Sequence, residues 1–333
     1  MAAILGPMTY LALVQRLWLE SGSSGGMPTT VLNPTPGSEW HRLCTWIAQA
    51  YLDIQLWRDD WLWMEQDVIF DSIAGQQEYP PETTIFSTPP SATGIITMTI
   101  APPAVVSWTA HGLQDGDRVV FTTTGALPSG VVAGQVYFVL AAGLTANSFQ
   151  FSATDDGVAV ITTGIQSGVH TAQEVGLTDF RRWKINGTSG ESSFRCFLKS
   201  VGVVNEVNLD ASLDYKEFRD YYIFGAKRLV RSRPISICVG PKKQLMLGFT
   251  PNDVYTVDGR YIQTPTVLVN DTDIPTFNSR YHMVLVYLAL YKYAFYEVAP
   301  EVIASSKKMA TDMIWEMENE QLPDIQLADP LVG

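Results

Sequence analysis

Cysteine is scarce in this sequence of 333 residues. Its three cysteines, Cys44, Cys196 and Cys238, are odd in number and far apart. This spacing fits neither a disulfide framework nor a zinc-binding knuckle. We therefore predict free thiols in a protein that is made in a reducing cytoplasm.

Basic residues are also few. The chain has 22 lysines and arginines against 34 aspartates and glutamates, which gives a net charge of −12. A protein that binds nucleic acid without sequence preference needs clustered positive charge to displace counterions from phosphates, so this class is disfavoured. The same charge suits a surface along which DNA slides, because like charges repel.

Long apolar runs are absent. No stretch reaches about 18 consecutive apolar residues, the length at which a membrane-spanning helix is expected. The N-terminal residues 1–19 lack a basic region, and Gln15 and Arg16 interrupt their apolar run, so we do not interpret them as a signal peptide. We predict a soluble protein with no membrane partner.

Catalytic and cofactor-binding motifs are missing as well. The sequence contains no HExxH, Walker, GxGxxG, GxSxG or CxxC pattern, and its four histidines have no metal-ligand spacing. His282 is expected to be a core or interface histidine with one hydrogen-bond partner, rather than an acid or base. Asp115 and Asp117 flank Gly116, which favours a β-turn over the alternative of a calcium loop. We predict no enzymatic activity and no catalytic, cofactor-binding or metal-binding residue.

Helical patterns occupy both ends of the chain. Residues 8–20 and 38–57 are amphipathic, and Ser38 is an N-cap for the second segment. Its apolar stripe consists of Leu43, Trp46, Ile47, Ala50, Tyr51, Ile54 and Trp57. We expect this stripe to pack on a helix over residues 279–297.

The segment 279–297 is so apolar that Lys292 is the only formal charge between Arg280 and Glu297. A helix of this composition has no solvent-facing side and must be packed on most sides. A second helix is predicted from Pro300, and Pro323 ends it. We expect the apolar faces of these two helices to remain open in one chain and to be covered by neighbouring subunits.

The stretch 91–173 has sparse charge and recurrent turn signals between strand-like runs. The predicted strands are 95–100, 104–109, 118–123, 135–140, 148–152 and 158–162. Short strands without a helical pattern predict a compact all-β barrel or sandwich domain. We predict that it is inserted into a host fold made of residues 1–90 and 174–333.

The host segments around this insert contribute further elements. Strands are predicted over 65–71, 180–185, 194–201, 204–209, 235–239, 244–247 and 254–264, and a helix over 214–229. The predicted fold class is therefore α+β. It combines a helical bundle of N- and C-terminal helices with a central antiparallel β region and the inserted all-β domain.

Basic residues gather at Arg181–Lys184 and at Lys227–Arg233. Both clusters are able to contact phosphate. Because the whole chain carries −12, we favour salt bridges to acidic neighbours across a subunit interface.

The order of these elements resembles that of head–tail adaptor (connector, or head-completion) proteins of tailed bacteriophages. The resemblance covers residues 8–88 and 175–325, and includes the segments Gly75–Pro80 (GQQEYP) and Asp179–Lys184 (DFRRWK). Within the insert, Trp108–Leu113 (WTAHGL) and Thr124–Pro128 (TGALP) resemble a β module of many phage virion proteins.

This resemblance implies a structural virion protein, made in the host bacterial cytoplasm, that forms a homo-oligomeric ring, commonly a dodecamer. The ring would lie in the virion neck between the portal protein and the tail or nozzle proteins. Double-stranded DNA would pass through its lumen without sequence-specific binding. The expected portal or subunit interface consists of Leu322, Pro323, Ile325, Leu327, Pro330, Leu331, Met309, Met313 and Met317. For the three methionines, filling of the core is the alternative.

A second hypothesis is a neck or tail binding module whose β insert contacts host surface glycans or decorates the virion. Aromatic side chains on exposed loops would favour it, and Trp108 is the only tryptophan in the insert. A hydrolase acting on the envelope is a third hypothesis, but the sequence offers it no acid–base pair.

Overall fold

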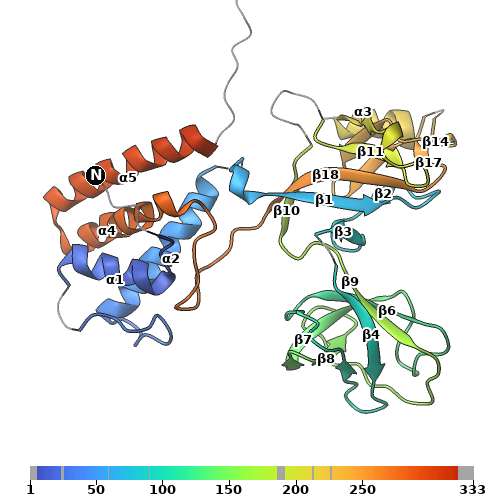
Figure 1. The fold of residues 1–333 in the computed structure, drawn as a ribbon, viewed down its shortest axis with the longest axis horizontal. Helices are drawn as coiled ribbons and strands as arrows, with labels where there is room; N and C mark the ends of the chain where they lie inside the picture. The colour runs from blue at the N-terminus through green and yellow to red at the C-terminus, as the bar shows by residue number, and fades with distance from the viewer. Residues whose placement is uncertain are drawn as a thin grey trace, which may run out of the picture. The chain divides into compact units, whose positions relative to one another are not determined.

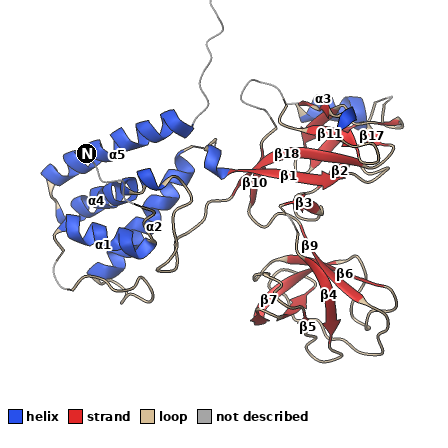
Figure 2. Cartoon of the chain, viewed as in Figure 1, coloured by secondary structure: helices blue, strands red, loops and turns tan. Residues whose placement is uncertain are grey.

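The computed structural model describes residues 6–23, 26–58, 60–89, 91–185, 192–211, 214–225 and 227–321 (Figure 1). The chain divides into two compact units. The helical unit comprises residues 1–65 and 264–333, and the β unit comprises residues 66–263. The described residues form five α-helices and several antiparallel sheets (Figure 2), so the predicted α+β class is confirmed.

The described part of the helical unit contains α1 (Tyr10–Ser21), α2 (Glu39–Trp57), α4 (Met283–Glu297) and α5 (Pro300–Gln321). Side-chain oxygens cap the first two helices. Thr9 accepts a hydrogen bond from the backbone N–H of Ala12, and Ser38 accepts one from the backbone N–H of His41. These bonds satisfy N–H groups that have no partner inside the helix. The predicted cap at Ser38 is confirmed, whereas the first helix begins two residues after the predicted start at residue 8.

Helix α4 packs against α1, α2 and α5 (Figure 1). Its buried side chains are Val284, Leu285, Val286, Ala289, Leu290 and Ala294. The predicted apolar helix is confirmed, but its cover comes from a single chain. The expectation that neighbouring subunits must cover the helix is therefore wrong for these six side chains. The exposed apolar side chains lie at its C-terminal end, at Phe295, Tyr296 and Val298.

The apolar stripe of α2 faces α4, as predicted. Most of the stripe is buried, namely Leu43, Ile47, Ala50, Tyr51 and Ile54. Trp46 meets Tyr293 of α4 edge to face, with ring centroids 5.8 Å apart. The exception is Trp57, the last residue of α2, whose indole is exposed.

The β unit contains a six-stranded sheet of order β12–β11–β18–β1–β3, with β10 also paired to β18. The strands are β1 (Glu65–Asp71), β3 (Phe86–Thr88), β10 (Phe180–Trp183), β11 (Arg195–Leu198), β12 (Val207–Asn208) and β18 (Tyr255–Gln263). Strand β18 pairs antiparallel with both β10 and β11. The core on this sheet is largely aromatic and includes Phe70, Phe86, Trp183, Phe194 and Tyr261.

A smaller sheet has the order β13–β15–β16–β2. Its strands are β2 (Glu78–Tyr79), β13 (Asp210–Ala211), β15 (Ser236–Val239) and β16 (Leu245–Gly248). The predicted hairpin at 235–247 is confirmed by the antiparallel pair β15–β16. Beside it, β14 (Arg231–Ser232) pairs in parallel with β17 (Thr250–Pro251).

The predicted helix over residues 214–229 is wrong in length. Helix α3 covers Tyr215–Phe218 and continues as a π-helical turn over Arg219–Ile223. A Cβ atom on Gly225 would lie 2.5 Å from the carbonyl oxygen of Asp220. The backbone therefore turns back on the π-helical turn at a glycine, where the sequence alone suggested continuation.

Six strands close into a barrel in the order β4–β5–β8–β7–β6–β9. They are β4 (Thr93–Met98), β5 (Val106–Ser107), β6 (Arg118–Thr123), β7 (Val136–Thr145), β8 (Ser148–Ser152) and β9 (His170–Val175). Aromatic rings fill its core, among them Phe121, Tyr137 and Phe151. That this segment is an inserted domain stays a prediction.

One predicted barrel strand is wrong. Residues 158–162 form an irregular segment with an isolated bridge between Ser152 and Ala159, and the barrel is closed by β9 instead. The β9 sequence alternates His170, Ala172 and Glu174 with Thr171 and Gln173. Its inward positions are not uniformly apolar, so the alternation typical of a strand was not visible.

A tight contact inside the large sheet predicts the effect of one substitution. A Cβ atom on Gly259 of β18 would lie 2.1 Å from the buried ring of Phe194. We expect Gly259→Ala to lower the free energy of unfolding by about 1–3 kcal/mol, because the core must expand. Urea denaturation measures this. Gly26→Ala, where no atom lies within 4 Å, is the control, and equal losses in both variants would contradict the packing argument.

The buried His282 predicts a pH dependence of the helical unit. Its Nδ1 accepts a hydrogen bond from the Met8 N–H at 3.0 Å, and its Nε2 lies 3.1 Å from the Phe277 carbonyl oxygen. The prediction of a core histidine is confirmed, with two partners instead of one. Burial lowers the pKa of His282 below 6.5.

The unfolded chain therefore binds a proton more readily than the folded one, so stability falls as the pH drops below about 6.5. We expect the stability of His282→Leu to depend less on pH below about 6.5, because the titrating imidazole is absent. At neutral pH we expect this variant to be less stable by about 1–3 kcal/mol, because the polar groups of Met8 and Phe277 lose their hydrogen-bond partner. Urea denaturation of both proteins at several pH values tests this. An unchanged pH profile in the variant would contradict it.

Candidate functional site

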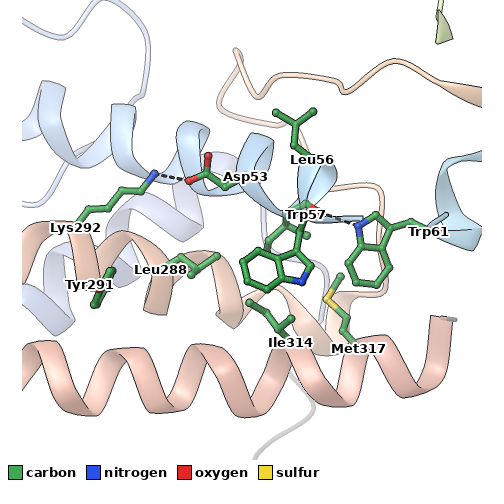
Figure 3. A pocket seen from close by; sticks show the side chains of 10 residues that line it. Asp53, Leu56, Trp57, Trp61, Leu288, Tyr291, Lys292, Ile314 and Met317 are labelled. Carbon is green, nitrogen blue, oxygen red and sulfur yellow. Dashed lines mark hydrogen bonds and ion pairs between the residues drawn. The ribbon is translucent and has the colours of Figure 1, made fainter. Parts of the chain in front are cut away.

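A groove in the helical unit lies where α2, α4 and α5 meet (Figure 3). Its volume is about 420 Å³. The residues that line it are Asp53, Ile54, Leu56, Trp57, Trp61, Leu288, Tyr291, Lys292, Ile314 and Met317. Because most of these side chains are aliphatic or aromatic, the groove presents mainly apolar surface. We name it the α2/α4/α5 groove.

Among the residues of the groove, Trp61 and Met317 have the least exposed surface. The indole Nε1–H of Trp61 donates a hydrogen bond to the backbone carbonyl of Ile54 at 2.9 Å (Figure 3). The one polar atom of this side chain is therefore satisfied inside the protein. These two residues give the groove a fixed wall made within one chain.

Two exposed side chains project at the end of α2. Leu56 and Trp57 are 56% and 62% exposed. The Nε1–H of Trp57 donates to Glu318 Oε1 of α5 at 3.0 Å, and Arg58 Nε lies 2.9 Å from the same oxygen. The indole is thus held in one place while much of its surface meets water. Such a side chain has little conformational entropy to lose when a partner binds it.

An ion pair borders the other side of the groove. Lys292 Nζ of α4 lies 2.6 Å from Asp53 Oδ2 of α2 (Figure 3). Both side chains are partly exposed, so the pair stabilises the fold by about 1 kcal/mol or less. The two charges neutralise each other beside apolar walls. The arrangement suits the apolar side chains of a protein segment better than a charged small molecule.

The expected interface residues fall into two groups. Leu322, Pro323, Ile325, Leu327, Pro330 and Leu331 lie outside the described residues. The three methionines lie on α5 in different environments. Met317 is buried in the groove wall, Met313 is half-buried, and Met309 is 50% exposed. Core filling therefore accounts for Met317, whereas Met309 is accessible to a partner.

All three cysteines are free thiols, as predicted, and the structure buries all three. Burial raises the pKa of the Cys44, Cys196 and Cys238 thiols to about 11. At neutral pH they are therefore protonated and poorly nucleophilic.

The Asp115–Gly116–Asp117 segment is a hydrogen-bonded turn. The Gln114 N–H donates to Asp117 Oδ2 at 2.6 Å, and the Asp117 N–H donates to the Gln114 carbonyl at 3.2 Å. Gly116 has a φ of 84°, which glycine adopts without strain. Across the described ranges, no group of three His, Cys, Asp or Glu side chains is placed to hold a metal ion.

Within the part of the chain that the structure describes, no helix combines the length and apolar character needed to cross a bilayer. No protein-family model matches the chain, and no curated protein sequence matches it.

The sequence did not identify the groove. The sequence pattern places Trp57 in the apolar stripe of α2 and indicates no role for Leu56 or Tyr291. The available signal was the position of Trp57 as the last apolar residue before Arg58, where the helix ends. A side chain in the last turn has fewer neighbours than one in the middle of a helix.

Two methionines of α5 provide a matched test of the groove wall. We expect Met317→Ala to lower the free energy of unfolding by about 2–4 kcal/mol, because it opens a cavity among buried side chains. Met309→Ala, on the same helix but exposed, is expected to change it by less than about 0.5 kcal/mol. Urea denaturation measures both. A similar effect of the two substitutions would contradict the described packing of α5.

Proposed function

We propose that this chain is a structural virion protein of a tailed bacteriophage, which forms a ring adaptor in the virion neck between the portal and the tail. The observation that carries this proposal is the α2/α4/α5 groove with its fixed, exposed Trp57. An immobilised aromatic beside an apolar hollow is typical of a protein-docking site. The role is assembly, without catalysis.

Further apolar side chains on the helical unit support assembly. The exposed ones outside the groove include Leu19, Phe295, Tyr296, Val298, Met309 and Trp315. Large apolar side chains left in water favour contact with another protein, because association removes their surface from solvent. Residues 322–333 follow α5 directly, and in this proposal their apolar side chains contact the portal.

The distribution of charge supports passage of DNA without binding. Residues 1–65 and 264–333 contain seven basic and sixteen acidic residues. A ring lined by such units would repel phosphates, so double-stranded DNA would move through it without adhering. In the same proposal, the ring encloses the DNA, and tail or nozzle proteins attach to the ring.

The alternative of glycan binding by the barrel has less support. It required aromatic side chains on exposed loops, but Trp108 is buried in the barrel core. A Cβ atom on Gly94 would lie 2.4 Å from its indole nitrogen, so the ring is packed against β4. Ile95, Val158 and Ile165, which the barrel does expose, are aliphatic and do not stack on sugars.

Binding to the portal protein of the same virus tests the proposal. We expect the full-length chain to bind purified portal rings, and Leu56→Ser/Trp57→Ser to bind at least about tenfold more weakly, because hot-spot side chains carry most of the affinity. A chain that ends at Gln321 is also expected to bind more weakly. Surface plasmon resonance on immobilised portal measures the affinities.

The control is Val158→Ser/Ile165→Ser, which removes from the barrel two apolar side chains that are more exposed than Leu56 and Trp57. This variant should bind the portal like the unchanged chain. Absence of portal binding by the full-length chain, or equal losses in the groove and barrel variants, would contradict the proposal.

A further inference from the structure

Positive charge is concentrated in one segment of the β unit. From Lys227 to Lys243 the chain has six lysines and arginines and no acidic residue, although the whole protein carries −12. At its start, the Val230 N–H donates to the Lys227 carbonyl at 3.0 Å and closes a turn. Arg231 follows in β14. We name residues 227–231 the arginine turn.

The arginine turn is fixed to the β unit. Arg231 pairs with Thr250 of β17, and the Gly75 N–H donates to the carbonyl of Pro251 in the same strand at 2.8 Å. Lys227 Nζ lies 5.9 Å from the ring centroid of Phe249. These contacts hold both ends of the turn, so it presents a preformed surface to a partner.

Three arginines of this segment, Arg228, Arg231 and Arg233, form no ion pair with any residue that the structure describes. Leu229, between them, is 82% exposed. Duplex DNA would pair with the arginines but leave Leu229 in water, because its phosphate backbone offers no apolar area. Arginines interleaved with exposed aliphatic side chains instead favour a protein surface that is both acidic and apolar.

The helical unit carries a surface of this complementary kind. Met309, Asp312, Trp315 and Glu316 are exposed along one side of α5, and Lys308, which is also exposed, precedes Asp312 by one turn on the same side. Asp312 forms no ion pair with a described residue, and Glu316 forms a long ion pair of 3.9 Å with Arg280. Trp315 is 65% exposed, and an indole face also attracts a guanidinium. We name these four residues the acidic face of α5.

We propose that the arginine turn of one copy binds the acidic face of α5 in a second copy of this chain. The two arginines of the turn pair with Asp312 and Glu316, while Leu229 packs beside Met309 and Trp315. Two different surfaces meet, so the contact is head-to-tail and generates a closed ring where the rotation between copies permits closure. This inference rests on the proposed function, because it names the subunit contact of the proposed ring.

Sedimentation velocity of the full-length chain over a wide concentration range tests the contact. We expect self-association that weakens as salt is raised, because exposed charges are screened. Arg228→Glu/Arg231→Glu should raise the dissociation constant at least about tenfold, and Asp312→Lys/Glu316→Lys should do the same. An equimolar mixture of these two variants should associate again, because each supplies the charge that the other has lost.

Lys242→Glu/Lys243→Glu is the matched control. It makes the same change of charge in the same basic segment, at the turn between β15 and β16, and should associate like the unchanged chain. Circular dichroism and thermal unfolding verify that every variant is folded. A monomeric full-length chain, an equal loss in the control, or no recovery in the mixture would overturn the proposal. Loss of duplex-DNA binding with unchanged self-association in Arg228→Glu/Arg231→Glu would assign the turn to DNA and overturn it as well.

The test of this subunit contact and the test of portal binding can give different results. Portal binding with unchanged association of the charge-reversed variants would reject this subunit contact and leave the adaptor role standing. Restored association in the mixture without any portal binding would support the contact and reject the adaptor role.

Discussion

Burial of α4 is the constraint on which the helical unit depends. Between its ends Lys292 is the only charged residue of this helix, so the free energy of the helix is lowest when other helices surround it. Helices α1, α2 and α5 provide that cover within one chain. The charge of Lys292 lies at the partly exposed edge of this bundle, where it pairs with Asp53. Association with another protein then uses the surface that these helices leave exposed.

That remaining surface is unevenly distributed. The α2/α4/α5 groove is apolar and carries the indole of Trp57, which Glu318 holds in place. The acidic face of α5 instead carries both carboxylates and exposed apolar side chains. The β unit contributes a basic turn to an otherwise acidic protein. Separated surfaces of opposite character favour head-to-tail association over symmetric pairing. A ring adaptor needs such an arrangement, together with a second surface that meets the portal.

Local chemistry made much of the fold predictable from the sequence. The cap at Ser38, the stripe of α2 and the β15–β16 hairpin depend on neighbours in sequence, and sequence patterns predict such features well. The failures concern contacts between distant residues. The closing strand β9 is defined by its partners β4 and β6, and Gly225 ends a helix through its approach to the Asp220 carbonyl. The groove was not predicted because exposure of Trp57 depends on where α5 passes.

The adaptor account requires a defined number of copies of this chain to join one portal ring. Native mass spectrometry of the portal, alone and after addition of the full-length chain, measures that number directly. The account predicts one discrete complex, whose mass exceeds that of the portal by a whole number of 36.8 kDa subunits. That number should match the rotational symmetry of the portal. A portal whose mass does not change, beside a chain that stays monomeric, would contradict it.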